Sequence, residues 1–163
     1  MNLDSLRDVF HEQLKDVYSA EKQLCDALPT LIEAASSSRL QTALEEHLEV
    51  TKKQMETVRQ ILDGMGVNPG NTKCEAMEGL VKEAEGMAKK DGDADTRDAG
   101  VICAAQKAEH YEIATYGSLR TWARVIGEDD VAETLQKLLD EEYDADKTLD
   151  EIAEGYVNEK ATS

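Results

Sequence analysis

The stretch from Ala104 to Tyr116 constrains the fold of this chain most strongly, because it combines helix-forming residues with acidic side chains on an apolar face. It is rich in Ala and contains neither Gly nor Pro, which favours an α-helix. At about 100° per residue, Glu109 and Glu112 fall on the face that also carries Ile113. A buried carboxylate is normally neutralised, paired or bound to a metal, because leaving it unpaired is costly. The stretch therefore predicts that other segments supply partners for these two carboxylates.

Apolar side chains recur at helical spacing along most of the remaining chain. Pro29 lies inside the first such segment, and we expect it to bend the helix rather than end it because the apolar stripe continues beyond it. Ser38 with Gln41 indicates the start of the second helix, and Asp95 or Thr96 indicates the start of the third long helix. The spacing predicts long helices over about 5–35, 38–64, 95–126 and 129–159, and a shorter helix over about 75–90.

The order of these helices predicts an all-α fold in a single domain covering residues 1–163. Aromatic residues make up only 4% of the chain and there are two prolines, a composition that favours helices over a sheet. The long helices form two pairs, and the shorter helix lies in the connection between the pairs. Ferritin-like folds are connected in this way. We therefore expect a ferritin-like up-down four-helix bundle with a crossover segment that carries a short extra helix.

The charge of the chain argues against several classes of protein. There are 35 acidic residues against 18 Lys and Arg, a formal net charge of −17, and such a surface repels nucleic acids and anionic membranes. No apolar run approaches the ~20 residues that a membrane-spanning helix needs. The three cysteines form no CxxC motif, and no basic region followed by an apolar run stands at the N-terminus. We expect a soluble, cytoplasmic protein that binds neither nucleic acid nor membrane.

Acidic side chains occupy inner positions near the middle of three predicted long helices. Glu21 lies in the apolar stripe of the first, and Glu142 and Asp146 lie in that of the last, which runs on to Tyr156. Their mutual repulsion in a core of low dielectric calls for a cation, and no Lys or Arg lies at the centre of an inner stripe. Polar side chains at the edge of the second helix's inner face complete the set. The candidate metal ligands are Glu21, His47, Gln54, Glu109, Glu112, Glu142 and Asp146.

Simpler interpretations of the same side chains stay open. An inward Glu often reaches solvent at the edge of a helix, and the Glu-x-x-His motif of ferritin-type sites is absent from this sequence. Tyr18 and Tyr116 flank the carboxylates, either as core residues with a bonded hydroxyl or as redox-active groups beside a metal. His11 and His110 lie off the inner faces and are expected to be solvated or bonded at the surface.

Several segments resemble the signature segments of the YciF-type family. They are Val17–Leu24, His47–Thr51, Cys74–Leu80, Ala105–Gly117 and Leu139–Glu142. The resemblance covers nearly the whole chain. It implies a ferritin-like bundle, usually dimeric, from a bacterial or archaeal stress-associated group that is related to rubrerythrin-like di-metal carboxylate proteins. It also implies that the seven candidate ligands match family positions, whereas Val50, Lys52 and Lys53 depart from the commoner pattern.

Two functions are consistent with the sequence. One is a di-iron or di-manganese carboxylate protein, holding two divalent metal ions and acting on oxygen or peroxide, since carboxylate oxygens suit iron(II) and manganese. The other is a non-enzymatic, dimeric helical bundle with a structural or protective role and no redox metal. A weaker third alternative is an adaptor that binds a partner through the helix at 75–90. A homodimer is expected for either of the first two.

Overall fold

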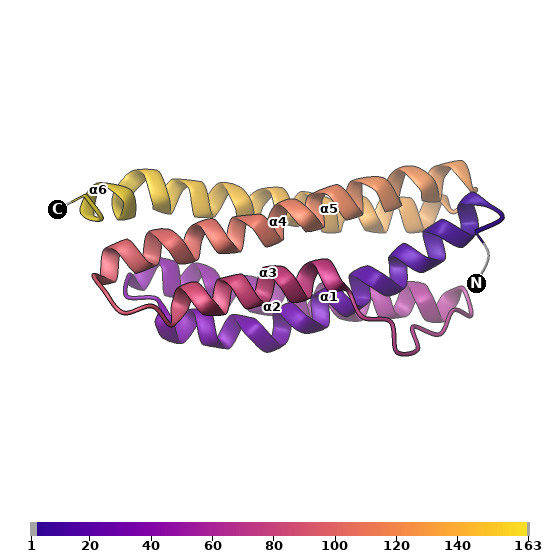
Figure 1. Cartoon of the computed structure of the whole chain (residues 1–163). Coiled ribbons are helices and arrows are strands. Elements are labelled where there is room, and N and C mark those ends of the chain that lie inside the picture. The colour runs from indigo at the N-terminus through magenta and orange to yellow at the C-terminus, as the bar shows by residue number, and fades with distance from the viewer. Residues whose placement is uncertain (1–2, 163) are drawn as a thin grey trace.

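The computed structural model describes residues 3–162, and this part of the chain is all-helical with no β-strand. Four long helices lie side by side as a bundle (Figure 1). The predicted ferritin-like bundle with a crossover helix is therefore confirmed. The long helices are α1 (Leu6–Ala34), α2 (Ser38–Gly64), α4 (Ala94–Val125) and α5 (Asp129–Ile152), and the crossover helix is α3 (Glu75–Ala88).

Helix α3 carries the chain from the end of α2 back to the start of α4, along the length of the bundle (Figure 1). It packs against α1 and α4. The hairpin pairs α1–α2 and α4–α5 therefore lie together, and α3 covers the groove between α1 and α4. A short π-helical turn, η1 (Ala153–Val157), and helix α6 (Asn158–Lys160) continue α5 to the end of the described chain.

The helix ends follow the sequence closely, with shifts of one or two residues at the caps. Pro29 lies inside α1, as predicted. The N-cap of α2 is Ser37 rather than Ser38, because the Ser37 hydroxyl accepts the amide N–H of Leu40. The N-cap of α4 is Asp93, which accepts the N–H of Thr96 at 2.8 Å. The predicted caps of α2 and α4 were wrong because several residues able to cap a helix stand close together at these points.

The inner face of the C-terminal segment also differs from the prediction. Tyr156 was expected on the inner stripe but is 39% exposed, whereas Val157 is fully buried. The π-helical turn at Ala153–Val157 adds a residue to the turn and so rotates the following side chains relative to an α-helix.

The core has an apolar cluster toward each end of the bundle, with a polar layer between them, and a smaller third cluster under α3 around Leu24 and Met77. Phe10, Leu14 and Val17 on α1 belong to one cluster, and Leu28 and Leu31 on the same helix belong to the other. The other long helices contribute to both clusters in the same way. The buried polar residues of the intervening layer are Glu21, His47, Thr51, Gln54, Glu109, Glu112 and Glu142.

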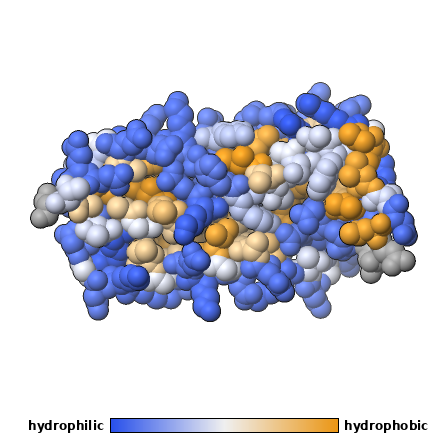
Figure 2. Space-filling model, turned by 45° about the horizontal axis from the view of Figure 1, so that its top comes forward, coloured by the Kyte–Doolittle hydropathy of each residue, from blue (hydrophilic) through white to orange (hydrophobic). Residues whose placement is uncertain are grey.

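On the face shown in Figure 2, hydrophilic side chains predominate, with apolar areas between them. Among residues 3–162, the large apolar side chains that are exposed are Leu3, Val125, Tyr143 and Tyr156. Among the helices described, none combines the length and apolar character that crossing a membrane requires.

Candidate metal centre

Buried ligand groups from the four long helices meet in the polar layer at the middle of the bundle. Ligand atoms of His47, Glu109, Glu112 and Glu142 all lie within 4.8 Å of one another. His47 comes from α2, Glu142 from α5, and the other two lie one turn apart on the same face of α4. Glu21 on α1 is fully buried beside them, and its carboxylate raises the pKa of both α4 glutamates. The packing of the bundle thus places four carboxyl groups and one imidazole in one small, water-poor site.

The pKa values of these carboxyl groups show how unfavourable their charges are in the absence of a cation. Burial raises the pKa of Glu21 to about 8, and the negative charge of Glu142 adds to this effect. Burial also raises the pKa of Glu109 and Glu112 well above the ordinary range, and nearby carboxylates raise each further. Burial raises the pKa of Glu142 as well. A cation that binds here would displace protons from these groups.

Most carboxylate oxygens at the site have no hydrogen-bond partner. Both oxygens of Glu112 are buried and unpaired, and so is one oxygen each of Glu21, Glu109 and Glu142. Buried oxygens without partners are rare in folded proteins, because each has lost its bonds to water. These residues therefore fit a metal ion well, since a cation would satisfy their free lone pairs.

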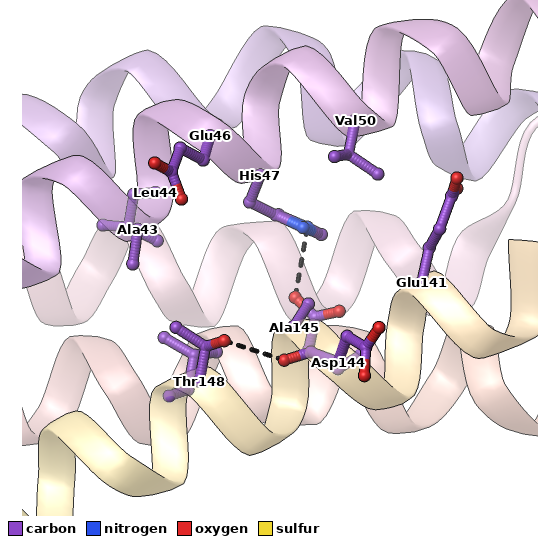
Figure 3. A pocket seen from close by; sticks show the side chains of 11 residues that line it. Ala43, Leu44, Glu46, His47, Val50, Glu141, Asp144, Ala145 and Thr148 are labelled. Carbon is purple, nitrogen blue, oxygen red and sulfur yellow. Dashed lines mark hydrogen bonds and ion pairs between the residues drawn. The ribbon is translucent and has the colours of Figure 1, made fainter.

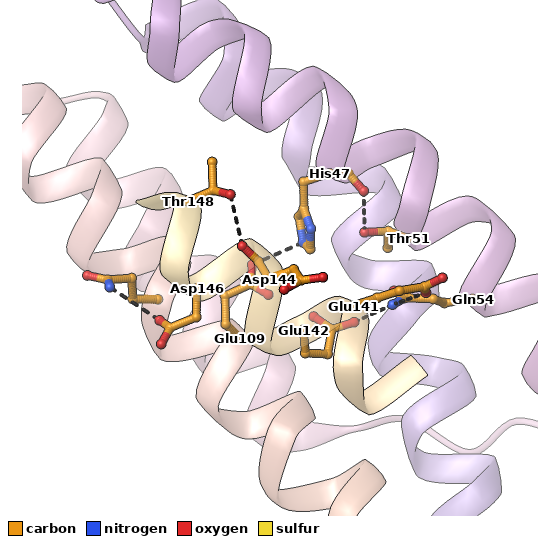
Figure 4. Close-up of polar contacts among 10 residues, drawn as sticks. His47, Thr51, Gln54, Glu109, Glu141, Glu142, Asp144, Asp146 and Thr148 are labelled. Carbon is orange, nitrogen blue, oxygen red and sulfur yellow. Dashed lines mark hydrogen bonds and ion pairs between the residues drawn. The ribbon is translucent and has the colours of Figure 1, made fainter. Parts of the chain in front are cut away.

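His47 lies at the edge of the cluster with its ring directed toward Glu109 (Figure 4). Its Nε2 atom is 3.1 Å from Oε1 of Glu109, while its Nδ1 atom is buried without a partner. Burial lowers the pKa of His47 to about 4, so the imidazole is neutral near pH 7 and this contact is a hydrogen bond rather than an ion pair. A neutral imidazole is the form that binds metals. The peptide oxygen of His47 accepts the Thr51 hydroxyl at 2.9 Å.

Gln54 acts on the cluster as a hydrogen-bond donor. Its amide nitrogen donates to Oε1 of Glu142 and, at 3.0 Å, to Oε2 of Glu141 (Figure 4). This hydrogen bond orients the Glu142 carboxylate. The amide oxygen of Gln54 is buried and unpaired, so it is the atom of Gln54 that is able to bind a metal. On the opposite side, the hydroxyl of Tyr116 donates to Glu21. Tyr116 is thus a core residue with a bonded hydroxyl that touches a candidate ligand.

Asp146 stands apart from the other candidate ligands. It is half-buried, with 17% of its side chain exposed, and it interacts with Gln106 at 3.2 Å and His110 at 3.1 Å, both on α4. Asp146, four residues after Glu142, is rotated about 40° past the direction of Glu142, so it turns away from the cluster toward the surface of α4. His110 is exposed and bonded at the surface, as the sequence predicts. The structure therefore brings Glu21, His47, Glu109, Glu112 and Glu142 together, places Gln54 beside them and leaves Asp146 outside.

Sequence reasoning did not identify Glu141 as a second acceptor for Gln54, nor Tyr116 as the donor to Glu21. Each contact joins residues about ninety positions apart on different helices. Helical periodicity shows which side chains point inward but not which of them meet across the core. The position of Tyr116 one turn after Glu112 was the available signal for its place beside the carboxylates.

The family described as "Domain of unknown function (DUF892)" matches residues 5–162. The chain belongs to this family. It is 43% identical over 162 residues to Protein YciF of Escherichia coli strain K12, covering 99% of this chain and 98% of that protein. The resemblance to YciF-type proteins predicted from the sequence is therefore confirmed.

Solved structures support the same assignment. The crystal structure of the E. coli stress protein YciF superposes with a TM-score of 0.91 at 42% identity, covering 95% of this chain and 98% of that chain. A protein of Rhodopseudomonas palustris, described provisionally as structural, gives a TM-score of 0.87 at 39% identity, covering 91% and 95% of the two chains. A Xanthomonas campestris protein shares the fold, with a TM-score of 0.77 at 23% identity over 94% of each chain.

Proposed function

We propose that this protein is a stress-associated, ferritin-like protein that holds two divalent metal ions, iron or manganese, at the middle of its bundle. The observation that carries the proposal is the group of buried carboxyl oxygens without partners in the polar layer. His47, Glu109, Glu112 and Glu142 already have ligand atoms within 4.8 Å of one another. The proposed ligands are Glu21, His47, Glu109, Glu112 and Glu142.

The donor set favours iron and manganese. Four carboxylates and one imidazole offer mainly hard oxygen ligands, which suit iron(II) and manganese better than the softer metals. When bound, such ions would supply redox chemistry toward a small oxidant, oxygen or peroxide. Gln54 orients Glu142 through its amide N–H, and Tyr116 orients Glu21 through its hydroxyl. Protons held by the buried carboxyl groups would leave as the ions bind.

The charge of the protein bears on its partners. A formal net charge of −17 favours partners other than nucleic acids and anionic membranes. We place the protein in the cytoplasm, as a homodimer. Its E. coli relative carries the description of a stress protein, and this supports a role for the present chain under stress.

Metal analysis of protein expressed with ample iron and manganese tests the proposal. About two ions per chain are expected for the natural protein, and the Glu112→Gln variant should lose most of them, because Glu112 offers two unpaired oxygens at the centre of the site. Glu133→Gln removes one exposed carboxylate far from the site and serves as the matched control. A natural protein without bound metal, or a Glu112→Gln variant with full metal content, would contradict the assignment.

A structural or protective role without a redox metal is the second candidate. The R. palustris neighbour carries a provisional description as a structural protein, and the raised pKa values of the inner carboxyl groups allow a neutral, protonated core. The two candidates differ in their response to Mn²⁺. A metal site predicts a melting temperature that rises with Mn²⁺ concentration, whereas the structural role predicts no dependence.

A further inference from the structure

A cavity of about 270 Å³ opens between α2 and α5 and reaches the polar layer from the side of the bundle (Figure 3). Small or short side chains line it where the two helices face each other, namely Ala43, Val50 and Ala145, all of them half-buried. These residues do not fill the space between the helices. The cavity is many times the ~30 Å³ that one water molecule occupies in the liquid, so it has room for a cation together with part of its hydration shell.

The inner end of the cavity is formed by two members of the buried cluster. His47 and Glu109 both line it, and they are 9% and 1% exposed. Nδ1 of His47 and Oε2 of Glu109 are buried and have no hydrogen-bond partner. The two residues at the inner end of the cavity thus each carry a free ligand atom.

The outer end of the cavity is acidic. Glu46 on α2, and Glu141 and Asp144 on α5, stand at the opening as exposed carboxylates (Figure 3). No lysine or arginine is among the described residues that line it. A cleft lined by charges of one sign raises the local concentration of the opposite ion and can accelerate its association by 10-fold or more. This opening therefore attracts divalent cations and repels anions.

The other approaches to the cluster are apolar or closed. The two apolar clusters of the core fill the bundle on either side of the polar layer. On the side of α1 and α4, a recess of only about 20 Å³ lies under α3. It also touches His47 and Glu109, but the rest of its lining is apolar, with residues such as Leu24, Leu28 and Leu80. A hydrated cation would lose its water without compensation in such surroundings.

We propose that the cavity between α2 and α5 is the route by which divalent cations reach and leave the buried cluster, and that Glu46, Glu141 and Asp144 collect them at its mouth. This inference rests on the proposed metal site. It adds a path and a set of collecting residues that are distinct from the ligands themselves.

The first test obstructs the route without touching a ligand. In the Val50→Phe variant, a phenyl ring replaces the smaller Val side chain and fills the space between α2 and α5. Co²⁺ binding is followed by stopped-flow absorbance, and Co²⁺ release by mixing with a chelator. We expect both the association and the dissociation rate constant to fall at least tenfold, while the equilibrium affinity stays within about twofold, because a barrier on the path affects both directions equally. Val131→Phe, at a half-buried position at the start of α5, is the control and should leave both rates unchanged.

The second test removes charge at the mouth, and it holds even if Val50→Phe fails to fold. Glu46→Gln combined with Asp144→Asn should lower the association rate of Co²⁺ several-fold at low salt and weaken its dependence on ionic strength. The matched control combines Glu45→Gln with Asp140→Asn, exposed acids on the same two helices that do not line the cavity. Rates equal to those of the natural protein in both the obstructed and the neutralised variants would overturn the route. Failure of the natural protein to bind Co²⁺ would instead overturn the metal site.

Discussion

The pH dependence of the metal-free protein gives a sharp test of the buried carboxyl cluster, through the single change Glu21→Gln. Glu21 is fully buried and accepts a hydrogen bond from Tyr116. Burial raises its pKa from the ordinary 4.5 to about 8. Gln has nearly the same shape but does not titrate, so the variant isolates the effect of one proton.

The sign and size of the effect follow from this shift. Between pH 4.5 and pH 8 the folded chain keeps a proton on Glu21 that the unfolded chain releases. The free energy of unfolding therefore falls as the pH rises through this range, and levels off above it. The difference of about 3.5 pKa units, at about 1.4 kcal/mol each, amounts to up to about 5 kcal/mol for this one group.

Urea unfolding in the presence of a chelator, at pH values from 5 to 8, measures the effect. The natural protein should lose stability steadily over this range, and Glu21→Gln should lose less. Glu133→Gln, which removes an exposed carboxylate, should follow the natural protein. Parallel curves for the natural protein and Glu21→Gln would refute the idea that Glu21 holds a proton in the core. Added Mn²⁺ should stabilise the natural protein by about 2.7 kcal/mol at one hundred times its dissociation constant, and the variant by less.

Three further substitutions test hydrogen bonds at the cluster and at the α1–α2 loop. Tyr116→Phe removes the donor to Glu21 and should lower the free energy of unfolding of the metal-free protein by about 1–3 kcal/mol, measured in urea; an unchanged value would show that this contact is not made in solution. Asp98→Ala leaves two backbone amides of the α1–α2 loop without the acceptor they now have at 2.7–3.1 Å, so a loss of about 3 kcal/mol is expected by the same method, and unaltered stability would contradict it. Gln54→Leu removes the donor that orients Glu142 and should weaken Mn²⁺ affinity by about 10–100-fold in equilibrium dialysis; retained affinity would mean that Glu142 needs no support.

The helices and the inward direction of the acids could be predicted from the sequence, because both depend on local periodicity. Pro29 was placed correctly inside a helix, since the apolar stripe on either side of it is continuous. The caps at Ser37 and Asp93 were missed by one or two positions. Neighbouring Ser and Asp residues there compete for the same role, and their local preferences are nearly equal.

The composition of the site was only partly predictable, because it depends on how the helices rotate against one another. Asp146 and Glu142 share a helix face by spacing, yet the packing of α5 against α4 turns Asp146 toward Gln106 and His110. Gln54 was expected among the ligands; its amide N–H donates to Glu142, and its amide oxygen is left without a partner. Such choices arise from contacts between residues that are far apart in sequence, on which periodicity carries no information.

The division of the core by a polar layer has a mechanical consequence. A bundle with one continuous apolar core opens first at its ends, where fewer side chains hold each helix. Here the two apolar clusters hold the ends, while the middle contains carboxyl groups that repel one another once they ionise. Backbone amides around Thr51 and Glu112 should consequently exchange with deuterium early when the protein is stripped of cations at alkaline pH. A bound ion would hold the four long helices together at this layer, so the part of the bundle that opens most easily without metal would become resistant to opening.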